Sequence, residues 1–346
     1  MSSSPRHAVY TLVLLAACGG GSNGTGPEFE GGVQPPPNGV AQFTVSPLDL
    51  DRIPLLVPLG HLAPPGHVLP TDHVYFYQVN FDQRPIQPST AVLPVYAPAT
   101  GAVNFMLHQA GDDWKVQFIV TKDFSYYVDH LQPLPTLRVG TIVQAGEQIG
   151  TTNPGGSLDL GAYDLRTTRR GFLVPARYPD QSLHCVSPWA YFTEPLRSAM
   201  YAKMRRHPAV ADKDGQIDFD VAGRLVGNWF EESVPMDQTA SGPAGWPKSL
   251  AFVFDEVDPR VVRISIGGTV APPGIWGIPA DAPPPSTVAV ASGLVAYRLM
   301  YTESTTIQYG LMLVQMLADD RVRVEVFVGS QEGSGSFTNA ARVYRR

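Results

Sequence analysis

Phe-Ile-Val-Thr-Lys-Asp-Phe-Ser-Tyr-Tyr-Val-Asp-His-Leu, residues 118–131, decides the fold of this chain together with two shorter runs that follow it. These are Val-Gly-Thr-Ile-Val-Gln-Ala-Gly-Glu-Gln-Ile-Gly at residues 139–150 and Ser-Leu-Asp-Leu at residues 157–160. Apolar residues and glycines come in short bursts without a helical period, which indicates short strands joined by tight turns. Glycine tolerates φ > 0, so strands can reverse at each one. The pattern predicts a rolled, compact β-sandwich.

The same runs resemble the core of the lysostaphin/LytM-type zinc endopeptidases. In that family an aromatic-rich strand ends in His-Leu, then comes Val-x-x-Gly-x-x-Val-x-x-Gly-x-x-Ile-Gly, and a further strand carries His-x-His. Residues 127–131 match the first part and residues 139–150 match the second. The third part departs, because Ser157-Leu158-Asp159 stands where His-x-His is expected. With a weaker hairpin match at residues 94–103, the resemblance covers about residues 57–165.

A Pro- and Gly-rich loop at residues 57–73 holds three histidines and leads into the next predicted strand. In the resembling family this place carries His-x-Gly-x-Asp, whose His and Asp bind zinc. The resemblance therefore implies zinc ligands at His67 and at either Asp72 or His73, although His67 and Asp72 are one residue further apart than in the family. Asp159 would be the third ligand, which suits a catalytic zinc that keeps one position for water.

In the same family two histidines orient and deprotonate the attacking water, and His130 matches one of them. Ser157 takes the place of the other and cannot act as a base, because a hydroxyl does not titrate near neutral pH. A zinc site with one of two bases missing would be a weak hydrolase.

Other interpretations of these residues stay open from the sequence alone. The loop histidines could hydrogen-bond carbonyls that the prolines leave exposed, or the loop could bind a metal without peptidase activity. Asp159 could equally be a solvated position on an alternating strand, since Leu158 and Leu160 point the other way.

Composition limits the number of domains and the kind of partner to be expected. The chain has 346 residues, 33 Gly and 33 Pro, which leaves room for about two domains rich in turns. Its net charge is −6 and no basic block occurs, so nucleic acid is not an expected partner.

The first 18 residues have the composition of a targeting segment. Arg6 and His7 precede the apolar run 8–17, which is too short to span a bilayer. The run ends in Leu-Ala-Ala-Cys18, which resembles a bacterial lipobox and implies lipidation of Cys18, with a plain secretory signal as the alternative. The polar residues 19–42 predict a flexible linker between this anchor and the folded part.

The folded part is expected to divide into a LytM-like β domain at residues 43–205 and an antiparallel β-barrel-like domain at residues 206–346. A helix at residues 194–206 is the expected connector, because Leu196, Met200 and Met204 recur at helical spacing. In the second domain eight short strands are predicted. They are at residues 224–230, 250–255, 261–266, 288–291, 294–302, 308–317, 321–328 and 337–344.

Gly227-Asn228-Trp229 resembles the Gly-x-Trp start of lipocalin-type barrels. In lipocalins a late arginine packs over that tryptophan, and the resemblance gives this place to Arg342 or Arg345. A barrel of this size is expected to be filled by its own side chains rather than to hold a ligand.

The sequence thus predicts a mainly β, lipid-anchored protein of the cell envelope, placed at the outer membrane or a periplasm-facing surface. Its LytM-like domain is expected to be degenerate and to act as a binding or regulatory module on peptidoglycan or on an envelope protein. The first alternative is a zinc endopeptidase that cleaves peptidoglycan cross-links. The second is a small-ligand carrier that uses the barrel.

Overall fold

The computed structural model describes residues 32–240, 242–302, 304, 306–329 and 335–346. The predicted signal segment, its Cys18 and the first part of the linker lie outside these residues. No helix in the described ranges is both long enough and apolar enough to cross a bilayer.

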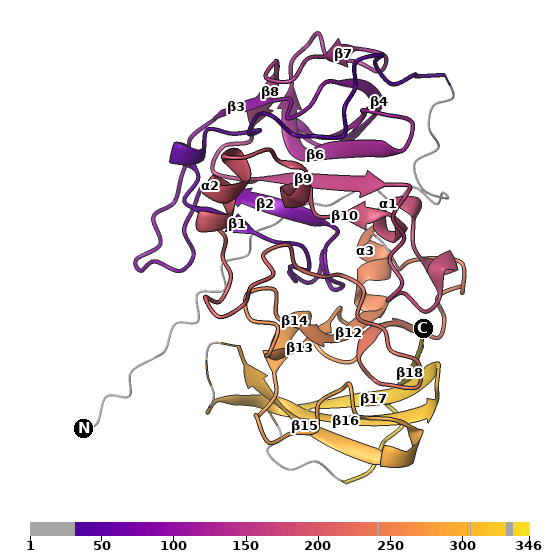
Figure 1. The fold of residues 1–346 in the computed structure, drawn as a ribbon. Coiled ribbons are helices and arrows are strands. Elements are labelled where there is room, and N and C mark those ends of the chain that lie inside the picture. The colour runs from indigo at the N-terminus through magenta and orange to yellow at the C-terminus, as the bar shows by residue number, and fades with distance from the viewer. Residues whose placement is uncertain (1–31, 241, 303, 305, 330–334) are drawn as a thin grey trace, which may run out of the picture.

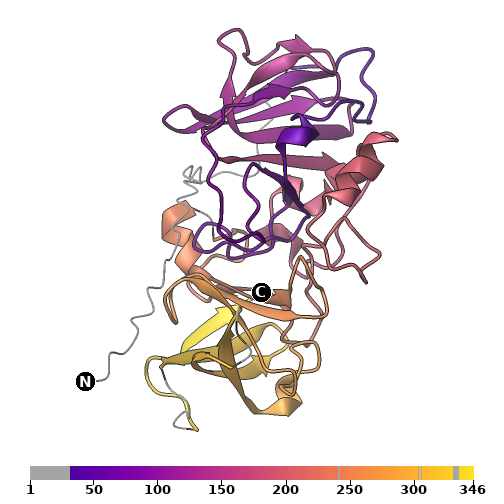
Figure 2. The same ribbon diagram turned by 90° about the vertical axis from the view of Figure 1, so that its left-hand side faces the viewer.

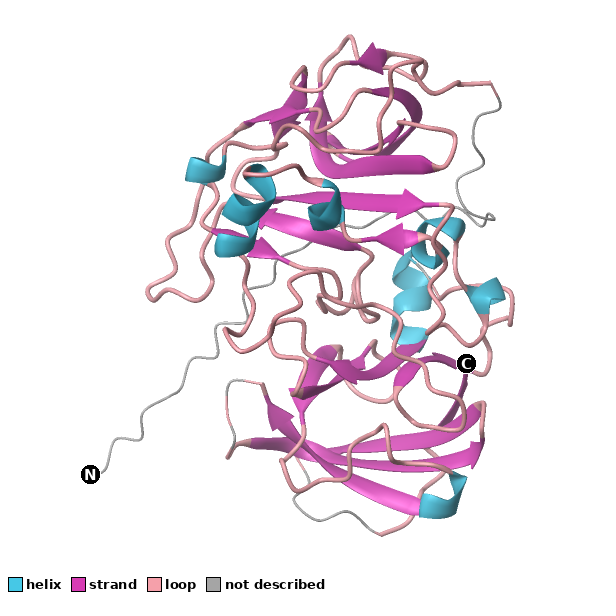
Figure 3. Ribbon diagram, in the orientation of Figure 1, coloured by secondary structure: helices cyan, strands magenta, loops and turns pink. Residues whose placement is uncertain are grey.

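Strands dominate the described chain, and they form two bodies (Figure 3). One body is a ten-stranded sheet and the other is a closed barrel. Two views at right angles place the barrel against one side of the sheet, with loops and short helices between them (Figures 1 and 2). The prediction of a mainly β chain with an antiparallel barrel in its second part is confirmed.

The sheet runs in the order β1-β2-β9-β6-β5-β4-β7, with β10 paired to β9, and with β8 joined to both β3 and β6. Its strands are β1 (Leu55–Val57), β2 (His73–Tyr77), β3 (Pro94–Tyr96), β4 (Gly101–Ala110), β5 (Asp113–Ile119), β6 (Phe124–Pro133), β7 (Ile142–Val143), β8 (Gln148–Thr152), β9 (Ser157–Asp164) and β10 (Cys185–Val186). Strand β9 therefore lies between β2, which follows the histidine loop, and β6, which carries His130.

The glycines of the motif have two different roles. Gly140 and Gly146 have φ of 88° and 83°, so they occupy the left-handed region that tight turns need. Gly150 lies within β8, where a Cβ atom would stand 2.3 Å from the carbonyl oxygen of Gln132. It permits close approach of two backbones rather than a reversal of the chain.

The barrel closes through eight antiparallel strands. They are β11 (Gly227–Glu231), β12 (Ser249–Phe254), β13 (Val262–Ile266), β14 (Gly274–Gly277), β15 (Leu294–Tyr301), β16 (Gln308–Ala318), β17 (Arg321–Val328) and β18 (Arg342–Arg345). The prediction of a strand at residues 288–291 is wrong, because the chain forms a 3-10 turn at Val290–Ser292. Strand β14 was missed, because its four residues are two glycines around Ile275 and Trp276 and carry no alternation.

In the described part of the chain, three short α-helices join the strands: α1 (Asp180–Leu183), α2 (Leu196–Ala202) and α3 (Gly242–Gly245). Helix α2 is the expected connector, shorter than predicted, and its Met200 is buried in the core of the sheet.

A buried arginine fixes one end of the barrel. Arg346 lies over the ring of Trp229, 3.9 Å from its centroid, and is 2% exposed. Its guanidinium donates to four backbone carbonyl oxygens, those of Val221, Arg224, Leu225 and Val226. The expectation that Arg342 or Arg345 covers Trp229 is therefore wrong. Both belong to strand β18, which pairs with β11 and β17. Arg346 lies just beyond the end of that strand.

Apolar contacts and ion pairs of Glu256 with His61 and Arg205 hold the barrel against the sheet. Leu62 of the histidine loop packs with Ala251 and Val253 of β12. Beside them, His61 Nδ1 lies 2.9 Å from Glu256 Oε1, and both side chains are largely buried.

Replacing Arg346 by Met should lower the free energy of unfolding by roughly 3 kcal/mol, because several buried carbonyls would lose a charged donor at once. Urea unfolding followed by tryptophan fluorescence measures this. Arg342→Met at an exposed position is the control and should change stability by less than about 0.5 kcal/mol. Equal effects of the two substitutions would contradict the role given to Arg346.

Replacing Glu256 by Gln should remove a pH-dependent part of the stability. Burial raises the pKa of Glu256, but the hydrogen bond and charge of His61 outweigh it, so the pKa lies below the ordinary value of 4.5. A depressed carboxyl pKa gives stability that is present above pH 4.5 and lost as pH falls through the folded-state pKa.

Urea midpoints of wild type and Glu256→Gln should therefore differ at pH 7 and converge as the pH is lowered through the acid range. Glu232→Gln is the matched control, because Glu232 forms a 2.8 Å ion pair with Arg321 at the surface, where such pairs contribute little. A gap between wild type and Glu256→Gln that stays constant with pH would exclude this contribution.

Candidate functional site

Strands β2 and β9 bring the end of the histidine loop against the strand that departs from the His-x-His pattern. They pair antiparallel with Tyr75 opposite Asp159. His73, the first residue of β2, places its Nε2 atom 3.4 Å from Asp159 Oδ2. That Nε2 atom is buried and makes no hydrogen bond within the described residues.

His130 reaches the same carboxylate oxygen from the other side. Strand β6 pairs with β9 up to Asp129 and with β8 from Leu131, so His130 sits where the strand changes partner. Its φ is 61°, a left-handed value that is uncommon for a residue other than glycine and is often found at functional sites. This local break turns the imidazole so that its Nε2 lies 3.5 Å from Asp159 Oδ2.

Both imidazoles are held in place through their other nitrogen. His73 Nδ1 lies 3.2 Å from Asp72 Oδ1, and His130 Nδ1 lies 3.0 Å from Asp113 Oδ2. A carboxylate on Nδ1 selects the tautomer and leaves Nε2 to face the site, which is the usual arrangement around metal-binding histidines.

These distances fit a zinc ion. Two atoms bound to one tetrahedral zinc at 2.0–2.1 Å lie about 3.4 Å apart. The separation of His73 Nε2 from Asp159 Oδ2 has this value. A buried imidazole nitrogen without a hydrogen bond, beside a buried carboxylate, is a donor pair that can hold a metal ion. His73 and Asp159 therefore fit as two of the ligands that the resemblance implies.

His67 lies next to this pair. Its ring contacts that of His73 edge-on, with centroids 5.3 Å apart. Burial, helped by the neighbouring His73, lowers the pKa of His67 to about 3. A neutral imidazole is the form that binds metal. Among the described residues, the ring nitrogens of His67 do not lie within 4.8 Å of both His73 Nε2 and Asp159 Oδ2, so His67 would have to turn toward this pair to become the third ligand.

Asp72 does not face Asp159. Its Oδ1 accepts a hydrogen bond from Tyr127 and contacts His73, and its Oδ2 accepts from Ser182 and Gln181. With both oxygens engaged, Asp72 supports His73 rather than competing with it for a metal. The choice between Asp72 and His73 that the sequence left open goes to His73 on this geometry.

Asp159 is 1% exposed, so the alternative that it is a solvated position is wrong. Leu158 and Leu160 on either side are also buried, because β9 is an inner strand covered on both faces. Burial raises the pKa of Asp159, but the charge of His130 outweighs it and the pKa lies below its ordinary value. Ser157 Oγ donates to Asp159 Oδ1 at 3.1 Å. Ser157 thus orients the carboxylate.

Two acidic residues that the sequence analysis missed lie behind His130. Asp113, Asp129 and His130 each place one ligand atom within 4.8 Å of the others. Both oxygens of Asp113 and the Oδ1 atom of Asp129 are engaged in hydrogen bonds, however. Asp113 accepts from Asn153 and Asp129 accepts from Gln109 and the His130 amide. In the sequence, Asp112-Asp113 follows Gly111 and does not differ from an ordinary solvated turn.

A cleft of about 1080 Å³ opens beside His67 and His73. One wall comes from β4 and β5, with Leu107, Gln109 and Lys115. A second wall comes from the barrel side, with Asn228 of β11, residues 237–240 and Trp246. The histidine site therefore borders a space large enough for a peptide segment.

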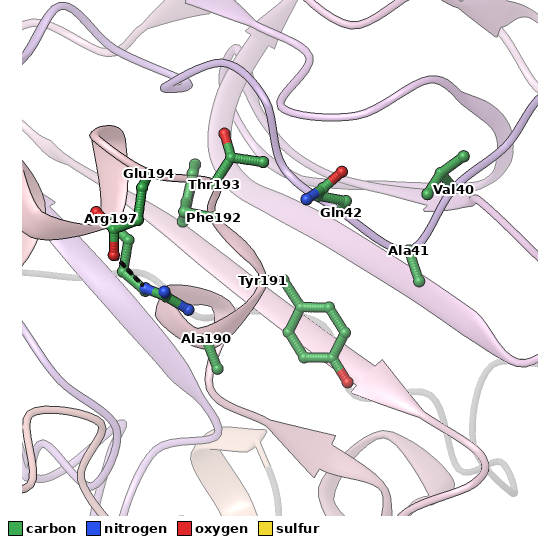
Figure 4. Close-up of a pocket in the computed structure, with 9 residues that line it drawn as sticks. All are labelled: Val40, Ala41, Gln42, Ala190, Tyr191, Phe192, Thr193, Glu194 and Arg197. Atoms are coloured by element: carbon green, nitrogen blue, oxygen red, sulfur yellow. Dashed lines mark hydrogen bonds and ion pairs between the residues drawn. The ribbon is translucent and has the colours of Figure 1, made fainter.

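A second hollow, of about 570 Å³, lies between residues 40–42 and residues 190–197 (Figure 4). Its nine lining residues include no histidine, cysteine or aspartate. Its one acidic group, Glu194, is paired with Arg197 at 2.9 Å. Nothing in this lining resembles a catalytic or metal-binding set.

Neither a family model nor a curated protein matches the sequence. Among solved structures, the chain is similar to Csd3 from Helicobacter pylori, with 19% identity over 44% of this chain and 36% of that chain and a TM-score of 0.29. It is also similar to a zinc-containing peptidase from Vibrio cholerae, with 17% identity over 36% of this chain and 37% of that chain and a TM-score of 0.27. LytU gives 18% identity, coverages of 33% and 73%, and a TM-score of 0.23.

The match spans little more than a third of the first two of these proteins. At such identities and scores, the function of the site has to be argued from its own residues.

Gly161→Ala should displace the ring of Tyr127, which supports the site through Asp72. A Cβ atom at Gly161 would stand 2.1 Å from the ring of Tyr127, whose hydroxyl is bound to Asp72. The ring would have to move, at a cost of about 1–3 kcal/mol in unfolding free energy. Urea unfolding measures this, with Gly156→Ala as the control because its nearest neighbour would be 3.7 Å away. Equal stability of the two variants would show that Tyr127 is not confined.

Proposed function

We propose that this chain is a zinc-dependent peptide hydrolase, held at a membrane of the cell envelope through a lipid on Cys18 and acting on peptide cross-links of peptidoglycan. One observation carries the chemical part of the proposal. Two imidazole Nε2 atoms, those of His73 and His130, meet one buried oxygen of Asp159 at 3.4 and 3.5 Å.

The residues divide into ligands and a proton carrier. His67, His73 and Asp159 would hold the metal. Bound zinc would supply a Lewis acid that activates water and polarises a peptide carbonyl. His130 would hold and release the proton at its Nε2 atom.

The surroundings of His130 suit that task. Burial lowers its pKa, but the carboxylates of Asp159 and Asp113 outweigh this and raise the pKa well above 6.5. Asp113 stabilises the protonated ring through Nδ1 and keeps its orientation, as the third member of a catalytic triad does. The ring can therefore deliver a proton to a leaving amine without turning.

A second candidate function, peptide binding without hydrolysis, is favoured by one residue. Ser157 stands where a second base is expected, and its hydroxyl is bonded to Asp159. Recognition by the cleft does not need that base, since binding and chemistry reside in different groups.

Metal analysis of the purified protein tests the first part. Wild type should carry one zinc per chain, and His73→Ala should lose it. Asp129→Asn is the control and should keep zinc, because Asp129 belongs to the cluster behind His130. If Asp129→Asn loses zinc and His73→Ala keeps it, the metal belongs to the cluster behind His130. Wild type without zinc would overturn the proposal.

Digestion of purified peptidoglycan, followed by mass spectrometry of the released peptides, tests the second part. His130→Asn should keep zinc and lower cleavage at least about 100-fold, because it removes the proton carrier. Asparagine also tolerates the left-handed backbone at this position. Zinc-loaded wild type that cleaves nothing would leave the binding function in place of the hydrolase.

A further inference from the structure

The wall that the barrel contributes to the cleft contains a polar group with an unmet hydrogen bond. Asn228 is 2% exposed and lines the cleft, and its Oδ1 has no hydrogen-bond partner among the described residues. Thr71 Oγ1, in the same lining, is also buried without a partner there. Most buried polar atoms in proteins are hydrogen-bonded, so unpaired atoms that border one cleft indicate a ligand.

The position of Asn228 follows from strand alternation. Trp229 points into the barrel, where it belongs to the core, so Asn228 and Phe230 point outward on β11. Phe230 packs against Leu69 and Tyr178 on the sheet side. Asn228 Nδ2 donates to the Tyr178 hydroxyl at 3.2 Å, which fixes the amide and leaves Oδ1 as an acceptor without a partner on a residue that lines the cleft.

Charge decides which kind of ligand group would meet that acceptor. The lining contains Asp72, Asp129, Asp180 and Asp237, against Lys115 and Arg177. The four carboxylates outnumber the two cations, and neither cation forms an ion pair with a carboxylate of this lining among the described residues. Lys115 Nζ lies 3.8 Å from the centroid of the Tyr127 ring, and Arg177 donates to the carbonyls of Pro235 and Gln238. The cleft therefore favours groups that donate hydrogen bonds and carry positive charge.

The barrel side of the cleft is rigid enough to act as a binding wall. Besides these two bonds from Arg177 to residues 235–238, the Thr239 hydroxyl donates to the Arg177 carbonyl. A wall that is ordered before binding loses less entropy when the ligand arrives.

We propose that Asn228 of the barrel is a ligand-binding residue of the cleft, whose Oδ1 accepts a hydrogen bond from an ammonium group on the side chain of a bound peptide. The inference rests on the proposed function for the identity of the ligand as a peptide. It adds that the barrel takes part in recognition and selects basic peptides over acidic ones.

Calorimetric titration of the full chain with three short peptides tests this. The probes are acetyl-Gly-Lys-Gly-Gly-amide, the same peptide with trimethyl-lysine, and the same peptide with Glu in place of Lys. Wild type should bind the lysine peptide about tenfold more tightly than the trimethyl-lysine peptide, which keeps the charge but has no N–H donor on its side chain. The glutamate peptide should bind more weakly than either.

Asn228→Leu should weaken binding of the lysine peptide about tenfold and abolish the preference over trimethyl-lysine. Asn104→Leu is the matched control, because Asn104 is also 2% exposed and both polar atoms of its amide lack a partner among the described residues. Asn104 lies in β4 and is not part of the cleft lining. It should leave the affinity unchanged.

If Asn228→Leu does not fold, the preference of wild type for lysine over trimethyl-lysine still decides the question. Equal affinity for those two peptides, a preference for glutamate, or no binding at all would overturn the inference. Zinc content, measured on the same samples, separates this from the proposed function. If the protein contains zinc and the Asn228→Leu variant binds the lysine peptide like wild type, only the role of Asn228 is refuted. If the protein contains no zinc but prefers the lysine peptide in a way that depends on Asn228, only the metal site is refuted.

Discussion

The buried carboxylate of Asp159 is the constraint on which the site depends. A carboxylate that is 1% exposed needs partners, because an unpaired charge is costly to bury. Here the partners are two imidazoles, one from the strand on each side, and the Ser157 hydroxyl on the second oxygen. Every other polar contact of the site holds one of these groups in position. Asp72 and Tyr127 hold His73, and Asp113 holds His130.

Strand order explains how these groups meet. An inner strand presents its side chains to two neighbours, and β9 has β2 on one side and β6 on the other. Regular pairing alone would not aim His130 at Asp159, because adjacent residues of a strand point to opposite faces. The left-handed backbone at His130, at the point where β6 passes from β9 to β8, supplies the missing rotation. Irregular pairing next to functional groups is common in sheets.

The barrel has a place in this arrangement beyond its own stability. Its core is closed by side chains such as Trp229 and Tyr297, and Arg346 covers one end. Its outer face then packs on the histidine loop through Ala251, Val253 and Glu256, and it forms one wall of the cleft. Contact with the barrel therefore limits how far the histidine loop can move. This links the position of His67 to a part of the chain more than 150 residues away.

The sequence by itself determined the class of the fold and the main candidates for the site. Short apolar bursts, glycines at turns and the alternation of residues 321–328 are local signals, and local backbone preferences fix strands without reference to distant residues. The contact of His73 rather than Asp72 with Asp159, the burial of Asp159 and the pairing of Arg346 with Trp229 were decided only by the tertiary structure. So were the supporting roles of Asp113 and Ser157 and the wall that Asn228 lends to the cleft. Each of these depends on which strands become neighbours and on which face of the sheet a side chain lies where the pairing is irregular. The spacing of residues along one strand determines neither property.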